Sequence, residues 1–364
     1  MMIDANVTTD ARGAASYRCI DFDQNRVRWD QWLKDATNAG ASQISAHLHS
    51  FRAYRADVSL QVIVDEAGEL LAGTGIVSWK VPGVGARFGV GIGSPVGDVK
   101  YWPQLLCGLS DWCRQQKWMC VELSPHVAGG NEQARCALSE AGFRPAPIFA
   151  PVSGLGADLR VPLRDRTEEE LLRSFRRQTR QHVTRSLTEG YQLSLPTSDE
   201  EVRVGVDFLH ATSVENGIPF GPRGRFMSAV LDLVKSNTGY LALAKHGDRP
   251  LAGGVFVRVG QAHSCYRLAT KRDDTHRRAA YFLHWMAMLR AHQERADWYY
   301  LTGRSTSSVY QFKRGFRPEE IELLKPHRLV LRPGLMRGIE TVQPIAMQTA
   351  RKVLGIANRL RGRS

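Results

Sequence analysis

Apolar residues along the chain alternate between short runs and helical spacings, and the same order of predicted elements occurs twice. In the first half, short apolar runs predict strands over 58–64, 70–79, 86–92 and 119–123, and helical spacing predicts helices over 101–117 and 131–141. In the second half, the same reasoning predicts strands over 240–244, 251–259, 262–269, 298–301 and 328–331, and helices over 275–295 and 306–314. We interpret both halves as having the same order, three strands, a long helix, a strand, a short helix and a final strand, with the final strand located by apolar residues only in the second half.

A short sequence repeat accompanies this repeated order. Gly142-Phe143-Arg144-Pro145 ends the short helix of the first half, and Gly315-Phe316-Arg317-Pro318 ends the matching helix of the second half. We interpret the shared element order and the shared tetrapeptide as a duplication. We therefore expect Phe143 and Phe316 at equivalent core positions of two related units.

A basic segment lies between the two halves. Residues 167–189 are predicted to form one helix, which begins at Thr167 with Glu170 as its capping-box partner. One face of this helix is apolar, and arginines occupy much of the rest, among them Arg176, Arg177, Arg180 and Arg185. A strand over 191–195 and two helices, within 200–215 and 223–236, are predicted to follow.

The charge of the chain is strongly positive. The sequence has 49 Lys and Arg against 36 Asp and Glu, a net charge of +13, which favours polyanions such as nucleic acid, an anionic membrane surface or phosphorylated substrates. The alternative is a basic, well-solvated surface with no such partner. Residues 348–364 carry five basic residues and no acidic one, interleaved with apolar residues, as in a basic amphipathic helix that lies on an anionic surface.

No run of about 18 apolar residues and no apolar N-terminal signal is present in the sequence. We therefore expect a cytoplasmic protein with peripheral contact to the inner membrane face. The six cysteines include no C-x-x-C pair, and the histidines and acids have no metal-ligand spacing, so no metal site is predicted. A G-x-S-x-G nucleophile elbow is also absent.

Antiparallel strands followed by helix, strand, helix and strand are the order of the Gcn5-related N-acetyltransferase (GNAT) fold. Two such units in one chain resemble the Fem family of non-ribosomal peptidyl transferases. The most specific match is Tyr299-Tyr300-Leu301-Thr302-Gly303 followed by Tyr310-Gln311-Phe312-Lys313-Arg314-Gly315-Phe316, which is similar to the family's "Y-D-x-x-G … F-K-x-G-F" signature. Leu138–Phe143 is similar to its "L-x-x-x-G-F" segment. Asp158-Leu159 resembles its strand entering the second unit.

The resemblance implies an α+β fold of two tandem GNAT-like units, each a mostly antiparallel mixed sheet flanked by helices. Residues 1–155 would form the first unit, on the acceptor side, and residues 156–332 the second unit, which includes the basic helix 167–189. Residues 333–364 would form a basic amphipathic C-terminal segment.

The Fem family transfers an amino acid from aminoacyl-tRNA onto a peptidoglycan precursor peptide, in cell-wall biogenesis. The resemblance therefore implies an aminoacyltransferase that needs no cofactor. Its donor would be an aminoacyl-tRNA and its acceptor a lipid-linked or UDP-linked precursor. The amino acid transferred and the oligomeric state stay open.

Two catalytic residues follow from the signature. By resemblance, Lys313, framed by Phe312 and Phe316, neutralises phosphate or the tetrahedral oxyanion at the junction of the units; Phe312 is its partner in the motif. The alternative is an exposed lysine near a helix end. The four arginines Arg176, Arg177, Arg180 and Arg185 are the predicted contacts to nucleic acid.

Substrate-binding residues are also implied. Tyr266 matches a family tyrosine that faces the substrate cleft, and Gly93-Ser94-Pro95 is similar to the family's G-P segment near the acceptor cleft. Arg304 and Ser305 precede a predicted helix and are expected to form an anion-binding N-terminus. The alternatives are a half-buried strand tyrosine, a plain turn and an ordinary helix cap.

The chain departs from the Fem pattern at Tyr300, where the family usually has Asp, and at Glu215, where an Arg often contacts the precursor. The coiled-coil arm of some members is missing.

A second possible enzyme function is that of a GNAT acyltransferase that uses acyl-CoA, for example in polysaccharide biosynthesis. CoA is disfavoured because residues 272–280 lack the glycines that open the pyrophosphate loop. A non-enzymatic reading is a basic RNA- or membrane-binding module.

Overall fold

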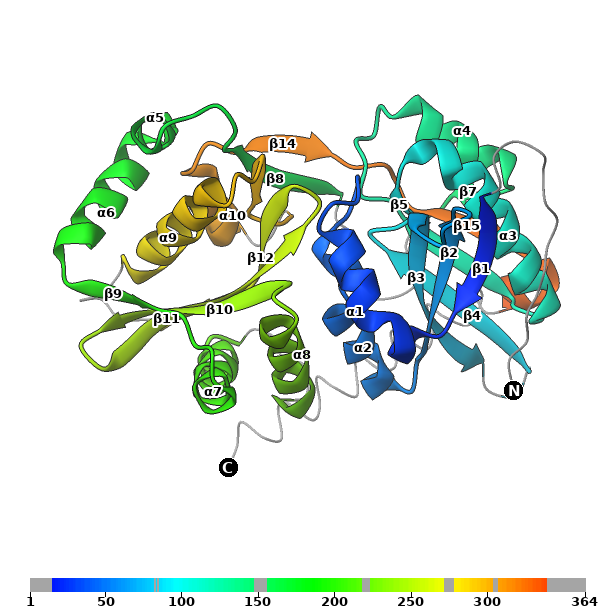
Figure 1. The fold of residues 1–364 in the computed structure, drawn as a ribbon, viewed down its shortest axis with the longest axis horizontal. Helices are drawn as coiled ribbons and strands as arrows, with labels where there is room; N and C mark the ends of the chain where they lie inside the picture. The colour runs from blue at the N-terminus through cyan, green and yellow to red at the C-terminus, as the bar shows by residue number, and fades with distance from the viewer. Residues whose placement is uncertain are drawn as a thin grey trace.

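The computed structural model describes residues 15–81, 83, 85–146, 156–217, 223–271, 278–303 and 307–338. These residues form two mixed sheets, each with helices on both faces (Figure 1). The predicted α+β class with two units, each a mixed sheet flanked by helices, is confirmed.

The first unit contains β1 (Ser16–Ile20), α1 (Phe22–Leu33), α2 (Ser45–Ser50), β2 (Asp57–Val64), β3 (Leu70–Val81), β4 (Ala86–Ile92), β5 (Val96–Gly97), α3 (Trp102–Gln115), β6 (Cys120–Ser124), α4 (Glu132–Glu140) and β7 (Arg144–Pro145). The strands and helices predicted from residue 58 onward are confirmed. The first strand and the first two helices were not predicted. In Figure 1, α1 and α2 lie on the side of the sheet that faces the second unit, and α3 and α4 lie on the other side.

The second part of the chain contains β8 (Ala157–Pro162), α5 (Glu168–Ser174), α6 (Arg177–Thr188), β9 (Tyr191–Ser194), α7 (Asp199–Glu215), α8 (Arg223–Lys235), β10 (Gly239–His246), β11 (Arg249–Val259), β12 (Ala262–Thr270), α9 (Ala279–Gln293), β13 (Trp298–Tyr300), α10 (Ser307–Arg314), β14 (Glu319–Glu322) and β15 (His327–Val330). Helices α7 and α8 cover one face of the second sheet, and α9 and α10 cover the other (Figure 1).

The basic segment 167–189 is two helices rather than the single helix that the sequence predicted. The capping box at Thr167 and Glu170 is present, as predicted. The helix stops at Phe175, whose backbone is extended. The buried Phe175 ring packs against Trp285 and Phe316, and the next backbone N–H, of Arg176, donates to Gly315 O at 2.9 Å. These tertiary contacts replace the helical hydrogen bonds that local propensity favours.

The two sheets have the same strand order, and the strand that follows the last edge strand of each unit in sequence joins the sheet of the other unit. The first sheet runs β1-β2-β3-β4-β6-β15-β7, and the second runs β9-β10-β11-β12-β13-β8-β14. Strand β8 follows the first unit in sequence yet lies between β13 and β14. Strand β15, which the sequence assigned to the second unit, instead pairs with β6 and β7 of the first sheet. The equivalent strands are therefore exchanged.

A buried ion pair holds the exchanged strand β15 in place. Arg328 Nη2 lies 3.0 Å from Glu122 Oε2 on β6, and the two side chains are only 6% and 1% exposed. Arg328→Met should lower the free energy of unfolding by about 3–5 kcal/mol, because it leaves the Glu122 carboxylate buried without its cation. Urea denaturation of the parent, of the single variant and of the double variant Glu122→Gln/Arg328→Met measures the free energy of unfolding of each. The double variant should recover much of the loss; equal unfolding free energies for the parent and the single variant would contradict the prediction.

Phe143 and Phe316 occupy matching places in the two units, as the duplication predicted. Each follows a short helix, each is completely buried, and each precedes a strand at the edge of its sheet.

The glycine that precedes each phenylalanine is required for a different reason. Gly142 has φ +87°, a backbone conformation that favours glycine. At Gly315 a side chain would instead collide with Thr179 on α6, since a Cβ there would lie 2.2 Å from its hydroxyl oxygen.

The two units share a hydrophobic core. Trp29 and Leu48 from the first unit belong to the same buried cluster as Val230 and Val255 from the second. At the edge of this cluster the backbone N–H of Gly260 donates to Leu33 O at 2.7 Å. The burial of this apolar surface stabilises the packing of the units against each other, and Ala36, Ala39 and Val259 of the cluster also line the pocket described below.

Candidate active site

Lys313 lies where two parallel strands of the second sheet stop pairing. Strands β12 and β13 are paired only from Ala262 with Trp298 to Ser264 with Tyr300. Just beyond this point, Lys313 Nζ on α10 donates to Thr302 O at 3.1 Å and to Gly303 O at 2.9 Å. The ammonium group is therefore tied to the chain that leaves β13.

The surroundings of Lys313 are partly apolar. Burial lowers its pKa, while the nearby Cys265 and Asp158 act in the opposite direction. The Phe312 ring packs against Tyr281 at 4.8 Å and against Phe316 at 5.4 Å. An ammonium group has three N–H donors, and two are used by carbonyl oxygens. No other acceptor of this ammonium lies within the described parts of the chain, so one N–H remains for an incoming oxyanion or phosphate.

The basic helix α6 packs directly against the end of α10. The absence of a Gly315 side chain allows Thr179 of α6 to approach closely. The structure therefore brings the predicted nucleic-acid contacts next to the helix that carries Lys313. Arg176, Arg177 and Arg185 are exposed, whereas Arg180 is half-buried and donates to Arg173 O at 3.1 Å.

Tyr266 makes a contact between the units. Its hydroxyl lies 2.8 Å from Nδ1 of His47 on α2. Burial, and to a lesser degree the charge of Arg267, lowers the pKa of His47 to about 4, so this imidazole is neutral near pH 7. Nδ1 of a neutral imidazole can accept a hydrogen bond from the Tyr266 hydroxyl. This bond orients the hydroxyl at the interface between the units.

The segment Gly93-Ser94-Pro95 is a buried turn of the first unit. Ser94 Oγ accepts a hydrogen bond from Thr74 Oγ1 at 2.7 Å. Gly93 has φ +66°, and a side chain there would meet Ser42. Two other predicted site residues, Arg304 and Ser305, lie outside the described residues, as do 272–277 and the basic segment 348–364.

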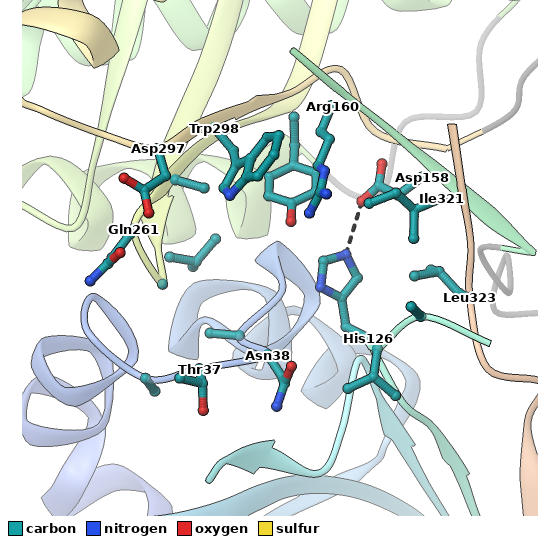
Figure 2. A pocket seen from close by; sticks show the side chains of 18 of the residues that line it. Thr37, Asn38, His126, Asp158, Arg160, Gln261, Asp297, Trp298, Ile321 and Leu323 are labelled. Atoms are coloured by element: carbon teal, nitrogen blue, oxygen red, sulfur yellow. Dashed lines mark hydrogen bonds and ion pairs between the residues drawn. The ribbon is translucent and has the colours of Figure 1, made fainter. Parts of the chain in front are cut away.

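A pocket of about 450 Å³ lies between the two units (Figure 2). The first unit contributes the loop after α1, with Asn38, and the loop after β6, with His126. The second sheet contributes β8, β13 and the turn between β11 and β12, with Asp158, Trp298, Tyr300 and Gln261 among the lining residues. Sequence reasoning did not identify this pocket.

The polar groups of the pocket are held in place by one another. His126 Nε2 lies 2.9 Å from Asp158 Oδ2, and the His126 ring contacts the Tyr300 ring edge-on at 5.4 Å. The Arg160 guanidinium lies 3.5 Å from the centre of the Trp298 ring and pairs with Glu319 at 3.1 Å. Asp158 belongs to the Asp-Leu segment noted in the sequence, and that segment was the one available signal for this site.

His284 supports the aromatic cluster behind Lys313 and provides a pH test of the packing. It is buried, and its Nδ1 lies 2.8 Å from the Tyr299 hydroxyl. Burial and the Lys313 charge lower its pKa from 6.5 to about 3. The unfolded chain therefore binds more protons between these values, and stability is lost as the pH falls from 6.5 toward 3, by about 1.4 kcal/mol per pH unit for this group. Urea denaturation from pH 4 to pH 7 should show a shallower dependence for His284→Gln. Parallel curves for variant and parent would argue against a neutral buried His284.

The chain is similar to one protein family model and to several solved structures. Residues 173–314 match the family described as "Acetyltransferase (GNAT) domain". Among solved structures, FemX is similar over 89% of this chain and 100% of that chain, with a TM-score of 0.76 and 15% identity. No match was found among curated protein sequences.

Two further solved structures are similar over most of their length. The C-terminal domain of a putative lysylphosphatidylglycerol synthetase from Agrobacterium fabrum has a TM-score of 0.55 and 14% identity, over 88% of this chain and 97% of that chain. L-PGS from Bacillus licheniformis has a TM-score of 0.55 and 12% identity, over 91% of this chain and 96% of that chain. The chain thus has the Fem-type fold of two tandem GNAT units, and its second unit carries an acyltransferase domain of the GNAT type.

Proposed function

We propose that this acyltransferase is an aminoacyltransferase, which moves an amino acid from aminoacyl-tRNA to an amine of a peptidoglycan precursor peptide. The observation that carries the proposal is the partly buried ammonium of Lys313, fixed by Thr302 and Gly303 at the point where β12 and β13 part. The donor and acceptor classes come from the resemblance to the Fem family, whose signature surrounds this lysine.

The chemistry fits the groups present. An activated ester attacked by an amine needs no covalent enzyme intermediate, only orientation of both substrates and stabilisation of the developing oxyanion. The remaining N–H of Lys313 supplies a fixed positive donor in partly dry surroundings, where a charge interaction is stronger than in water. No resident cofactor has a part in this scheme.

Charge supports a tRNA donor. Helix α6 presents Arg176, Arg177 and Arg185 to solvent while it packs against the end of α10. A phosphate backbone that follows these arginines would bring its aminoacylated end near Lys313. One structure with a similar fold is named as a putative lysylphosphatidylglycerol synthetase, and that name describes an aminoacylated product.

We also propose that the enzyme works in the cytoplasm, at the inner membrane face, on a lipid-linked or UDP-linked precursor. The basic segment 348–364 would supply the membrane contact. Among the helices that the structure describes, none is both long enough and apolar enough to cross a bilayer.

A transfer assay tests the proposed function. The purified chain is incubated with tRNA charged with radiolabelled amino acids and with a UDP-linked or lipid-linked precursor, and label in the precursor is measured. We expect label transfer that depends on the chain. Failure with every charged tRNA, together with CoA released from the purified protein and acyl transfer from acyl-CoA, would favour the CoA-dependent reading instead.

A further inference from the structure

The pocket between the units contains an imidazole that is held by a carboxylate of the other sheet. His126 follows β6 of the first sheet, and Asp158 lies on β8 in the second sheet. Their side chains are 9% and 4% exposed, and Nε2 lies 2.9 Å from Oδ2. The second carboxylate oxygen, Oδ1, accepts the backbone N–H of Leu159 at 2.8 Å. The carboxylate is therefore fixed at both oxygens.

This geometry determines which ring nitrogen of His126 is free. A carboxylate can only accept, so the proton of the neutral ring resides on Nε2 and a lone pair remains on Nδ1. Nδ1 has no hydrogen-bond partner among the residues that the structure describes, and Figure 2 shows it turned toward the cavity. A carboxylate that orients an imidazole in this way is the arrangement used for general-base catalysis.

The other lining groups favour an amine as the ligand. Although the chain has a net charge of +13, the pocket is lined by three aspartates, Asp35, Asp158 and Asp297, and by one arginine, Arg160. Arg160 is engaged by Trp298 and Glu319. Asp158 is paired with His126 and Asp297 with Arg164 at 3.3 Å, whereas Asp35 is exposed and has no ion pair within the described parts of the chain. Phosphates and carboxylates would be repelled here, whereas an ammonium group would be attracted.

The pocket is also close to Lys313. Tyr300 forms part of its wall, and Thr302, only two residues farther along the chain, accepts a hydrogen bond from Lys313. Two residues of extended chain span at most about 7 Å. Asp158 is near enough to Lys313 to influence its pKa. A nitrogen beside His126 is thus placed near an ester carbonyl held at Lys313.

We propose that the pocket between the units binds the acceptor as a primary amine and that His126 Nδ1 accepts a proton from the reacting nitrogen. The inference rests on the proposed acyl transfer. The bound ammonium gives one proton to Nδ1, and Asp158 stabilises the imidazolium. The amine attacks the ester, so a C–N bond forms as the C–O bond breaks. The second proton on that nitrogen passes to the leaving oxygen, and the imidazolium returns its proton to solvent.

The tautomer and the ligand class can be tested without any donor. The protein is labelled with ¹⁵N-histidine, and the His126 signals are assigned by comparison with His126→Gln. We expect the Nε2–H form, and n-butylamine should shift the Nδ1 signal while n-butyrate should not. Asp35→Asn should weaken n-butylamine binding about two- to fivefold at low salt, as for one exposed charge pair. An Nδ1–H tautomer, or an equal response to amine and carboxylate, would overturn the inference.

The role as a base is tested by kinetics in the intact protein. His126→Gln should lower kcat by roughly 10²–10⁴-fold, with little change in KM for the acceptor. Asp158→Asn should also lower kcat, because the amide can stabilise the wrong tautomer. His292→Gln is the matched control: His292 binds Arg166 O at 2.6 Å and does not line the pocket. It should transfer at the parental rate.

Chemical rescue separates a base from a merely structural histidine. His126→Ala leaves space in the pocket, and added imidazole should restore part of its transfer rate. A folded His126→Ala protein that imidazole does not rescue, or a His126→Gln protein with the parental rate, would overturn the inference. If the parent binds n-butylamine with the expected tautomer but transfers nothing from charged tRNA, the proposed donor is wrong, and the amine pocket is still supported.

Discussion

Lys313→Met is expected to reduce amino-acid transfer by roughly 10²–10³-fold, the usual cost of removing one preorganised contact to a developing oxyanion. Methionine keeps most of the length of the side chain, so packing beside Phe312 should survive. Thermal stability should be equal to that of the parent or higher, because burial already lowers the Lys313 pKa and so disfavours its charge. Single-turnover transfer and a thermal melt measure the two effects separately.

The control for Lys313→Met is the same substitution at the end of another helix. Lys235 is in the last turn of α8 and forms an exposed pair with Asp199. Lys235→Met should leave transfer unchanged. Arginine at position 313 is not a suitable control, because its planar guanidinium cannot reproduce the two carbonyl contacts of a compact ammonium. If Lys313→Met transfers at the parental rate, the lysine is only a structural clamp between α10 and the end of β13.

Replacement of Arg176, Arg177 and Arg180 by alanine should weaken tRNA binding and flatten its dependence on salt. Each lost phosphate contact lowers the slope of log K against log salt by about 0.7–0.9, so three contacts account for about 2–3. The arginines surround the start of α6, where Arg176 and Arg177 are exposed. Filter binding of tRNA from 50 to 200 mM salt measures the slope.

A matched triple variant controls for the change in net charge. Arg114, Arg135 and Arg203 are exposed arginines on α3, α4 and α7. Their replacement by alanine removes the same three charges from the net charge of +13. This control should keep nearly the parental slope. If both triple variants lose the same slope, binding depends on overall charge and α6 is not the tRNA contact.

Local sequence patterns predicted an element correctly where the residues of that element determine its structure. The apolar spacing of 240–269 predicted β10, β11 and β12, and the capping box at Thr167 and Glu170 predicted the start of α5. Helix α1 was missed because its buried face has few apolar residues, mainly Phe22, Trp29 and Leu33, among many polar ones. Its stability comes from packing against α2 and β2 of its own unit and not from its own periodicity.

The sequence by itself determined the class of fold, its duplication and the position of Lys313 in a Fem-like signature, because periodicity, caps and motifs are properties of neighbouring residues. Only the tertiary structure decided the place of β15 in the first sheet, the break at Phe175 and the pairing of His126 with Asp158. Each of these depends on contacts between distant segments. His126 and Asp158 come from different sheets, and no spacing along the chain encodes that their side chains meet.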